Sequence, residues 1–227
     1  MRNWIPAFVV VFIAIVGIGS AVTYEAPEFE IFLFNQELDQ DLFNAKSQTG
    51  IMIEETLNQL QPAMSELINE GQIYDQSADL TETFNIFNEV KDQLGIYVED
   101  VSPEIDKLIQ QLNFTKIEKR VSSLSQDHQP LAENLIESQQ ERLELLLVIH
   151  AQLEELDEKL VSFQEMFYSM ERPSQTLAYF QSLVYLLEEI DANHKDYVMA
   201  TENYQQAKTE YFLILINMGS RDYLFGA

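Results

Sequence analysis

The sequence predicts an all-α protein: an elongated antiparallel up-down-up-down helical bundle built on a long C-terminal coiled-coil hairpin. An N-terminal transmembrane helix or signal sequence is expected to precede it. Three observations predict this fold. An apolar heptad repeat runs through residues 130–218, as expected for packed long helices. Only 7 Gly and 6 Pro interrupt 227 residues, which argues against a many-stranded fold. Finally, an uncharged apolar run occupies residues 4–22.

The hairpin at 130–218 has two heptad arms joined by a turn. Pro173 cannot continue the first helix, so the chain is expected to reverse beside it. Antiparallel pairing sets an a position against a d position, and here the two residue numbers of each such pair add to 346, as in 163 + 183. The predicted pairs include Phe163–Leu183, Leu160–Leu186, Leu156–Ile190, Ile149–Tyr197, Leu146–Ala200, Arg142–Tyr204 and Leu135–Tyr211.

The e positions of this hairpin predict where the remaining helices pack. An apolar edge beside the a/d seam widens a two-helix seam into a bundle face. The earlier helices are therefore expected on the e side. The e residues are Ile136, Leu143, His150, Phe180, Leu187, His194 and Leu215.

The apolar run at 4–22 sets the expected compartment. At about 1.5 Å per residue it spans roughly 28 Å, close to the thickness of a hydrocarbon core. We favour a retained single-pass signal-anchor; Arg2 then keeps the N-terminus cytoplasmic and the bulk of the chain extracytoplasmic, periplasmic or extracellular. The alternative is a signal peptide cleaved after Ala21, which gives a secreted protein.

Boundaries follow from these features. Residues 1–24 form the anchor or signal peptide, 25–35 a juxtamembrane linker or helix start, 36–218 the helical bundle domain and 219–227 a tail. Within the bundle, a first helix is expected at 36–69, weakened at Gly50 and kinked or restarted at Pro62. A capping box from Asp79 to Glu82 begins a second helix, and Ser102-Pro103 predicts a restart within it.

Charge and composition exclude several classes of function. The net charge is -25, from 38 acidic and 13 basic residues. No positive stripe exists for phosphate contacts, so a nucleic-acid partner is excluded. The acidic surface either keeps the protein soluble or attracts a basic partner or divalent cations. Cysteine is absent, which excludes disulfides, thiolate metal sites and a cysteine nucleophile.

Two histidines give the sequence its one candidate site. In the predicted register His150 and His194 lie at nearly the same level, with Glu154 and Asp191 one helical turn from them. Imidazole and carboxylate groups at these spacings suit Zn²⁺ or a harder transition metal. The alternatives are polar residues at the seam edge hydrogen-bonded to neighbouring carboxylates, or a pH sensor.

Other polar or aromatic seam residues are interpreted as structural. Asn193 at d is expected to fix the register. Arg142 at d is expected to stack on Tyr204 while its charged head reaches solvent. Tyrosines at 197, 204 and 211 are expected in the core.

The sequence predicts a binding role and no catalytic one. It has no Gly-rich phosphate loop and no Gly-x-Ser-x-Gly elbow. The first hypothesis is a non-enzymatic membrane-anchored scaffold that binds a protein partner or self-associates, with no cofactor. The alternatives are a ligand-sensing or small-molecule-binding bundle, and a metal-binding bundle that uses His150 and His194.

Overall fold

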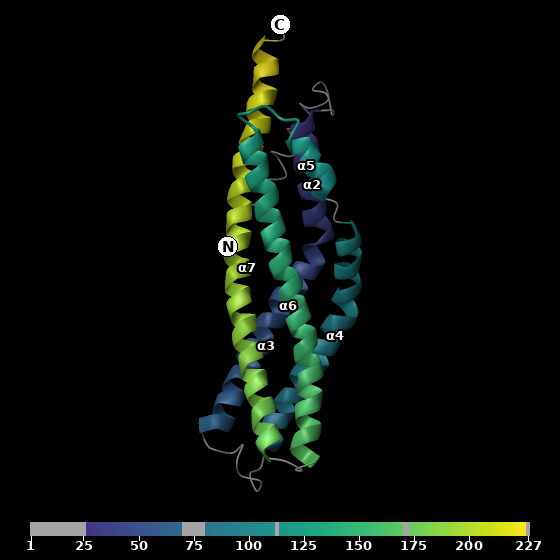
Figure 1. The fold of residues 1–227 in the computed structure, drawn as a ribbon, viewed down its shortest axis with the longest axis vertical. Coiled ribbons are helices and arrows are strands. Elements are labelled where there is room, and N and C mark those ends of the chain that lie inside the picture. The colour runs from purple at the N-terminus through teal and green to yellow at the C-terminus, as the bar shows by residue number, and fades with distance from the viewer. Residues whose placement is uncertain (1–25, 70–79, 112–113, 170–172, 226–227) are drawn as a thin grey trace. The chain divides into compact units, whose positions relative to one another are not determined.

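The computed structural model describes residues 26–69, 80–111, 114–169 and 173–225, and every element in them is helical. This confirms the all-α prediction for the described chain. The predicted membrane segment at 1–24 lies outside these residues, and none of the described helices is long and apolar enough to cross a membrane. The helices are α2 (Pro27–Asp41), α3 (Phe43–Asn69), α4 (Thr81–Gln111), α5 (Phe114–Val121), α6 (Gln129–Ser169) and α7 (Pro173–Phe225), shown in Figure 1.

The chain groups into two compact units. Unit 1 comprises Met1–Leu38, Asn113–Gln139 and Asn203–Ala227, and unit 2 comprises Asp39–Leu112 and Gln140–Glu202. Helices α2, α6 and α7 contribute residues to both units. Our domain boundaries, with one bundle domain at 36–218, stay predictions.

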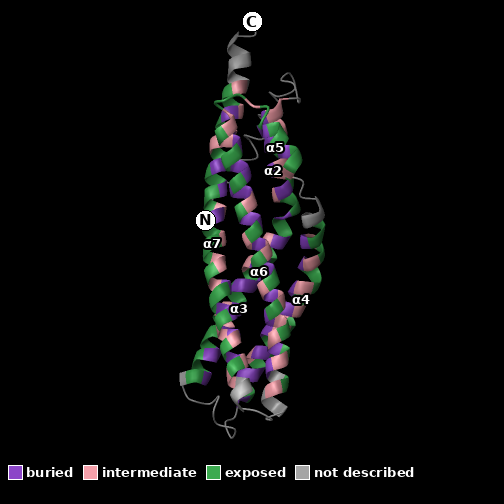
Figure 2. Cartoon of the chain, viewed as in Figure 1, coloured by how far each residue is buried: buried purple, intermediate pink, exposed green. Residues whose placement is uncertain are grey.

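Helices α6 and α7 form the predicted hairpin; α6 ends at Ser169 and α7 begins at Pro173. In unit 2 the two arms are joined by a 3.0 Å hydrogen bond from Asn193 to Gln152 and by a tilted contact between the rings of Phe163 and Phe180, with centroids 5.7 Å apart. Figure 2 shows buried positions, in purple, along α6 and α7, and most of the predicted seam in unit 2 is among the buried residues. Tyr179, Asn193 and Tyr197 are only half-buried, so the prediction that Tyr197 lies in the core is wrong. The buried members of the seam in unit 2 are Leu146, Ile149, Leu153, Leu156, Leu160, Phe163, Leu183, Leu186, Ile190 and Ala200.

The e side of the hairpin receives α4 in unit 2, as predicted. His150, an e residue, contacts Tyr97 of α4 with ring centroids 5.6 Å apart. One end of the seam carries an aromatic cluster in which Phe87 of α4 lies 5.8 Å from Phe163. The e residues Leu143, Phe180 and Leu187 are also buried.

The helices before the hairpin begin and end at other residues than predicted. The first helix starts at Pro27 within the expected linker, which supports the helix-start alternative there. The predicted restart at Ser102-Pro103 is wrong, because α4 continues through Pro103 to Gln111. Val101 and Ile105 stay buried on either side of Pro103. Their packing offsets the one backbone hydrogen bond that proline removes. Similarly, α3 runs through Pro62.

Unit 1 has its own core, built from α2, α5 and the nearby ends of α6 and α7. Tyr211 is fully buried, and its hydroxyl donates a hydrogen bond to the Glu28 carbonyl of α2 at 3.1 Å. The Glu28 carboxylate lies 2.9 Å from Nδ1 of His128. Aromatic contacts Phe32–Phe212 and Phe34–Phe114 complete the packing at 5.6 and 5.7 Å. The core also contains Ile31, Ile117, Val121, Ala132, Leu135, Ile136, Tyr204, Ala207 and Ile214.

Candidate functional site

A chain of polar side chains joins three helices inside unit 2. The Thr49 hydroxyl of α3 lies 2.9 Å from the Tyr97 hydroxyl of α4, which lies 2.8 Å from Nδ1 of His150 on α6. The other ring nitrogen, Nε2, is 3.3 Å from Oε1 of Glu154. Ser102 of α4 donates a hydrogen bond to the same carboxylate oxygen at 2.9 Å. We call these five residues the His150 network.

Helical periodicity positions each member of this network. Tyr97 follows Leu94 by three residues and precedes Val101 by four, so it lies on the buried stripe of α4. Thr49 occupies the buried stripe of α3 and also donates to the Ala45 carbonyl at 2.7 Å. His150 is at the e edge of the hairpin, where α4 packs. The network is therefore a polar seam between α3, α4 and α6.

Burial shifts the proton affinities of the two central groups. It raises the pKa of Tyr97 from 10.0 to about 12, because a phenolate is poorly solvated there. It also lowers the pKa of His150, against the opposing influence of the Glu154 and Asp106 carboxylates. Tyr97 and His150 are each 5% exposed and Thr49 1%. A substrate therefore cannot reach the central groups, so the arrangement suits structure or proton binding better than catalysis.

The four predicted metal ligands divide between different contacts. His150 and Glu154 do come together, but both nitrogens of His150 already face protein partners, Tyr97 and Glu154. Asp191 binds Lys195 through a 2.7 Å ion pair, and His194 is half-buried. Within the described part of the chain no three His, Asp or Glu side chains are grouped as a metal ion requires. The structure thus lends the metal hypothesis no support, whereas the hydrogen-bonded alternative fits His150.

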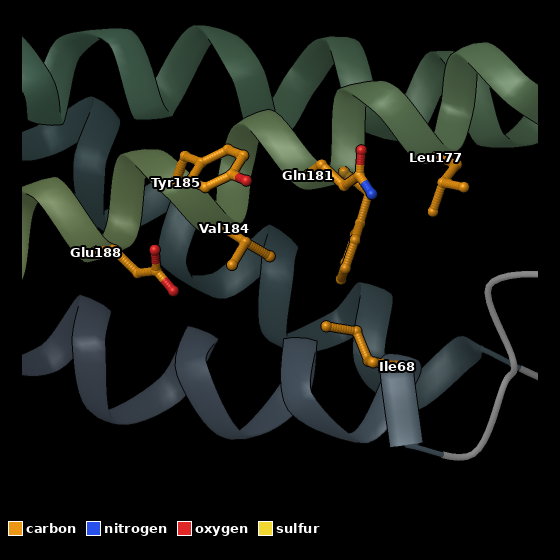
Figure 3. Close-up of a pocket in the computed structure, with 7 residues that line it drawn as sticks. Ile68, Leu177, Gln181, Val184, Tyr185 and Glu188 are labelled. Atoms are coloured by element: carbon orange, nitrogen blue, oxygen red, sulfur yellow. The ribbon is translucent and has the colours of Figure 1, made fainter.

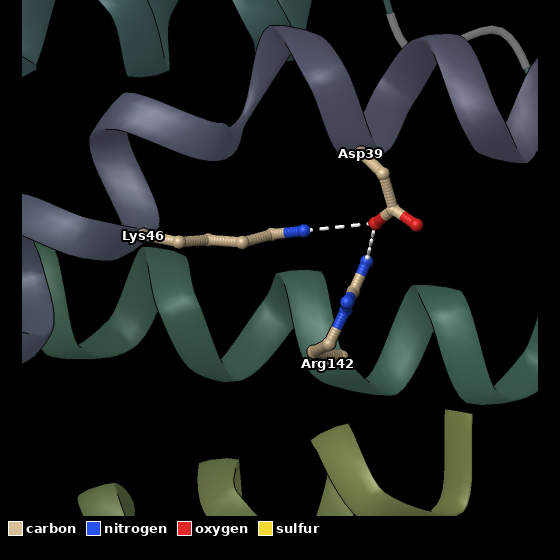
Figure 4. Close-up of polar contacts among 3 residues, drawn as sticks. All are labelled: Asp39, Lys46 and Arg142. Carbon is tan, nitrogen blue, oxygen red and sulfur yellow. Dashed lines mark hydrogen bonds and ion pairs between the residues drawn. The ribbon is translucent and has the colours of Figure 1, made fainter. Parts of the chain in front are cut away.

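A second polar cluster in unit 2 surrounds Asp39, drawn in Figure 4. Arg142 of α6 donates to Oδ1 of Asp39 at 2.6 Å, and Lys46 of α3 lies 2.9 Å from the same oxygen. The prediction that the Arg142 head reaches solvent is wrong, because its side chain is 3% exposed. Asp39 supplies a counter-charge inside the fold, so the cation has no need of solvent. In unit 1 the cation over the Tyr204 ring is Lys208, at 5.5 Å.

An apolar groove lies at the surface of unit 2, between the end of α3 and the first turns of α7. Figure 3 shows Ile68 on α3 facing Val184 and Glu188, which point from α7. The groove has a volume of about 260 Å³, slightly below the roughly 300–1,000 Å³ of most small-molecule sites. Ile68 is 52% and Tyr185 67% exposed. We call this the α3–α7 groove; it is lined by Ile68, Leu177, Phe180, Gln181, Val184, Tyr185 and Glu188.

Sequence reasoning found His150 and Glu154 but missed their partners on other helices. Tyr97 and Ser102 lie 53 and 52 residues from the groups they contact. Residue spacing reports neighbours on one helix and gives no distance between helices that are far apart in the chain. A polar side chain within an apolar helical stripe indicates a hydrogen-bond partner on another helix, and Tyr97 and Thr49 both occupy such positions. Asp39 and Lys46 carry no such mark, since acidic and basic residues are common on exposed faces.

None of the protein-family models, curated proteins or solved structures compared with the chain matches it. Function is therefore inferred from the sequence and from the geometry of the described residues.

Proposed function

We propose that this protein is a non-enzymatic, membrane-anchored extracytoplasmic scaffold that binds a basic protein partner. In this proposal the apolar run at 4–22 holds the chain in the membrane. The helices form an elongated antiparallel up-down-up-down bundle beyond it. The α3–α7 groove carries the proposal, since it exposes large apolar side chains on an otherwise acidic protein.

The exposed apolar residues of the groove support a docking role. An exposed tyrosine beside aliphatic side chains is typical of the central contacts in protein interfaces. Tyr185 and Val184 are neighbours on α7, and Ile68 on α3 faces Val184. The groove holds one or two apolar side chains of a partner, which suits a segment of a protein better than a complete small ligand.

The charge of the chain specifies the character of that partner. Basic side chains such as Lys46, Arg142 and Lys195 are already paired with carboxylates of the same chain. The excess of 38 acidic over 13 basic residues therefore leaves many carboxylates without a cation. Glu188 brings one carboxylate to the groove itself. A segment with an apolar residue flanked by Lys or Arg complements both features.

Site-specific photocrosslinking in the membranes of the host tests this proposal. A crosslinker replaces Gln181 in the groove or, as a control, Met199, an apolar residue of the same helix that is 55% exposed. We expect a protein adduct only from position 181, mapped to an apolar residue with basic neighbours. Tyr185→Asp is expected to abolish the adduct and Met199→Asp to preserve it. Adducts to lipid alone, or equal adducts from both positions, would contradict the proposal.

A further inference from the structure

The His150 network contains more polar contacts than protons when His150 is neutral. Its four successive contacts are Thr49 to the Ala45 carbonyl, Thr49 to Tyr97, Tyr97 to His150, and His150 to Glu154. The two hydroxyls and a neutral imidazole supply one proton each, so only three protons are available for the four contacts. One contact must therefore have no proton of its own, and we expect it to be the contact whose loss costs the least free energy.

Glu154 decides which ring nitrogen carries the proton. If Nδ1 were protonated, the bare lone pair of Nε2 would face an ionised carboxylate oxygen at 3.3 Å, which is repulsive. If Nε2 is protonated, it donates to Glu154, and Tyr97 donates its hydroxyl proton to Nδ1. The Thr49 hydroxyl then shares its single hydrogen between the Ala45 carbonyl and the Tyr97 oxygen, which weakens both hydrogen bonds only slightly. The neutral network therefore has an Nε2–H ring, with Tyr97 as donor to His150.

A second proton on the ring forces a different arrangement. Once Nδ1 also carries hydrogen, it must donate to the Tyr97 oxygen, so the Tyr97 hydroxyl turns to donate to Thr49. Thr49 then donates wholly to the Ala45 carbonyl, and all four contacts hold a proton. We propose that His150 is a proton switch, whose second proton reverses the hydrogen bonds that run from α6 through α4 to α3.

The charged groups around His150 determine when the switch operates. Glu154 on its own helix and Asp106 on α4 favour the imidazolium, while burial disfavours it and prevails, so the pKa of the ring is lowered. On α3 the facing group is the hydroxyl of Thr49, which does not titrate in this range. On α7 the predicted register places Asp196 and His194 at this level; Asp196 is exposed and His194 half-buried.

The sign of the pH effect follows from that lowered pKa. His150 binds a proton less well in the folded state than in the unfolded state, where its pKa is 6.5. Its neutral form therefore contributes stability above pH 6.5, and this contribution is lost as the pH falls from 6.5 through the folded pKa. Acidification below pH 6.5 therefore lowers the free energy of unfolding, until the ring is charged within the folded state.

Nitrogen NMR of the histidine rings in the full chain, held in detergent micelles, tests the switch. At neutral pH we expect the His150 signals of an Nε2–H tautomer with an unprotonated Nδ1 that accepts a hydrogen bond. On acidification both nitrogens become protonated only below pH 6.5, the ordinary histidine pKa. Tyr97→Phe removes the donor to Nδ1 and is expected to shift the Nδ1 signal, whereas His194→Gln leaves it unchanged. An Nδ1–H tautomer at neutral pH would overturn the proposal.

Unfolding measurements provide a second readout that does not depend on the tautomer. The unfolding midpoint of the wild type is expected to fall more between pH 7.5 and pH 5 than that of His150→Gln, whose side chain does not titrate. His194→Gln leaves the His150 network intact; as the matched control its midpoint is expected to fall more than that of His150→Gln. Equal losses in His150→Gln and the wild type would also overturn the proposal.

Discussion

At the scale of single residues, the interior of unit 2 depends on polar groups that satisfy one another. Asp39 receives both Arg142 and Lys46, and Tyr97 links His150 to Thr49. Buried charges and hydroxyls are costly unless they are paired, so removing one member leaves its partner uncompensated. These groups therefore favour one arrangement of α3, α4 and α6 over others.

The Asp39–Arg142 pair gives a direct stability prediction. Asp39→Ala leaves the buried guanidinium of Arg142 without its counter-ion and is expected to lower the free energy of unfolding by about 3 kcal/mol. Chemical denaturation measures the loss. Asp191→Ala is the matched control, because it breaks a pair whose Lys195 side chain is 70% exposed. Its cost is expected to stay below about 1 kcal/mol. Similar losses in both variants would mean that Arg142 finds other compensation.

Tyr97 predicts instability in alkaline solution. Its folded pKa is raised to about 12 from 10.0, so its contribution is fully present below pH 10 and is lost as the pH rises through 12. The loss over this interval is on the order of 2 kcal/mol. Denaturation at pH 9 and pH 12 measures it, with Tyr97→Phe as the comparison. If Tyr97→Phe loses as much stability as the wild type over this interval, the hydroxyl does not titrate as described.

At the scale of helices, periodicity predicted what is buried better than where helices end. The a/d seam and the e edge of the hairpin were predicted from residues such as Leu153, Phe163 and Leu187, which are buried. His194 and Leu215 at the e edge are half-buried. Ser102 shows the limit. Its hydroxyl suits a helix cap, but in the fold it donates to Glu154 of another helix. A single sequence does not reveal such competition between local capping and contacts with another helix.

The candidate site shows the same division between local and distant contacts. The proximity of His150 and Glu154 follows from four-residue spacing on one helix and was predicted. Their contacts with Tyr97 and Ser102 require the packing of α4 on the hairpin in one particular register. The e edge indicated which side α4 covers, but nothing in the sequence set how far α4 slides along it. The metal hypothesis needed Asp191 and His194 of α7 in addition to His150 and Glu154. Asp191 pairs with Lys195 and His194 is half-buried, and the metal site stays a prediction.

Two glycines within helices predict a gain in stability at this scale. Gly50 and Gly95 lie inside α3 and α4, and an added methyl group would meet no atom within 4 Å at either position. Gly50→Ala and Gly95→Ala are each expected to raise the free energy of unfolding by about 1 kcal/mol, since alanine loses less backbone entropy in a helix. Thermal or chemical denaturation checks both. A loss in either variant would show that the helix there is packed more tightly than described.

At the scale of the whole molecule, negative charge dominates the solution behaviour. A net charge of -25 with few basic residues makes the chain repel itself when it is compact. Raising the salt concentration from roughly 0.01 M to 0.15 M shortens the screening length from about 30 Å to about 8 Å. The thermal midpoint is therefore expected to rise with salt, measured by circular dichroism. A midpoint that falls with salt would indicate that attractive surface ion pairs outweigh this repulsion.

The central structural claim is that α6 and α7 form an antiparallel hairpin in the predicted register. The contacts of Gln152 with Asn193 and of Phe163 with Phe180 lie within one helical turn of the pairs that this register predicts. The His150 network uses residues of the α6 arm, and the α3–α7 groove uses residues of the α7 arm.

Distances between pairs of spin labels measure this register most directly. The chain has no native cysteine, so labels attach only where cysteine is introduced. Val148 and Val198 are both exposed, and the predicted register places them at the same level. Tyr185 lies 13 residues before Val198 on α7, about 20 Å along the helix axis. We predict a clearly shorter distance for the 148/198 pair than for the 148/185 pair. Equal distances, or a shorter 148/185 distance, would contradict the hairpin register.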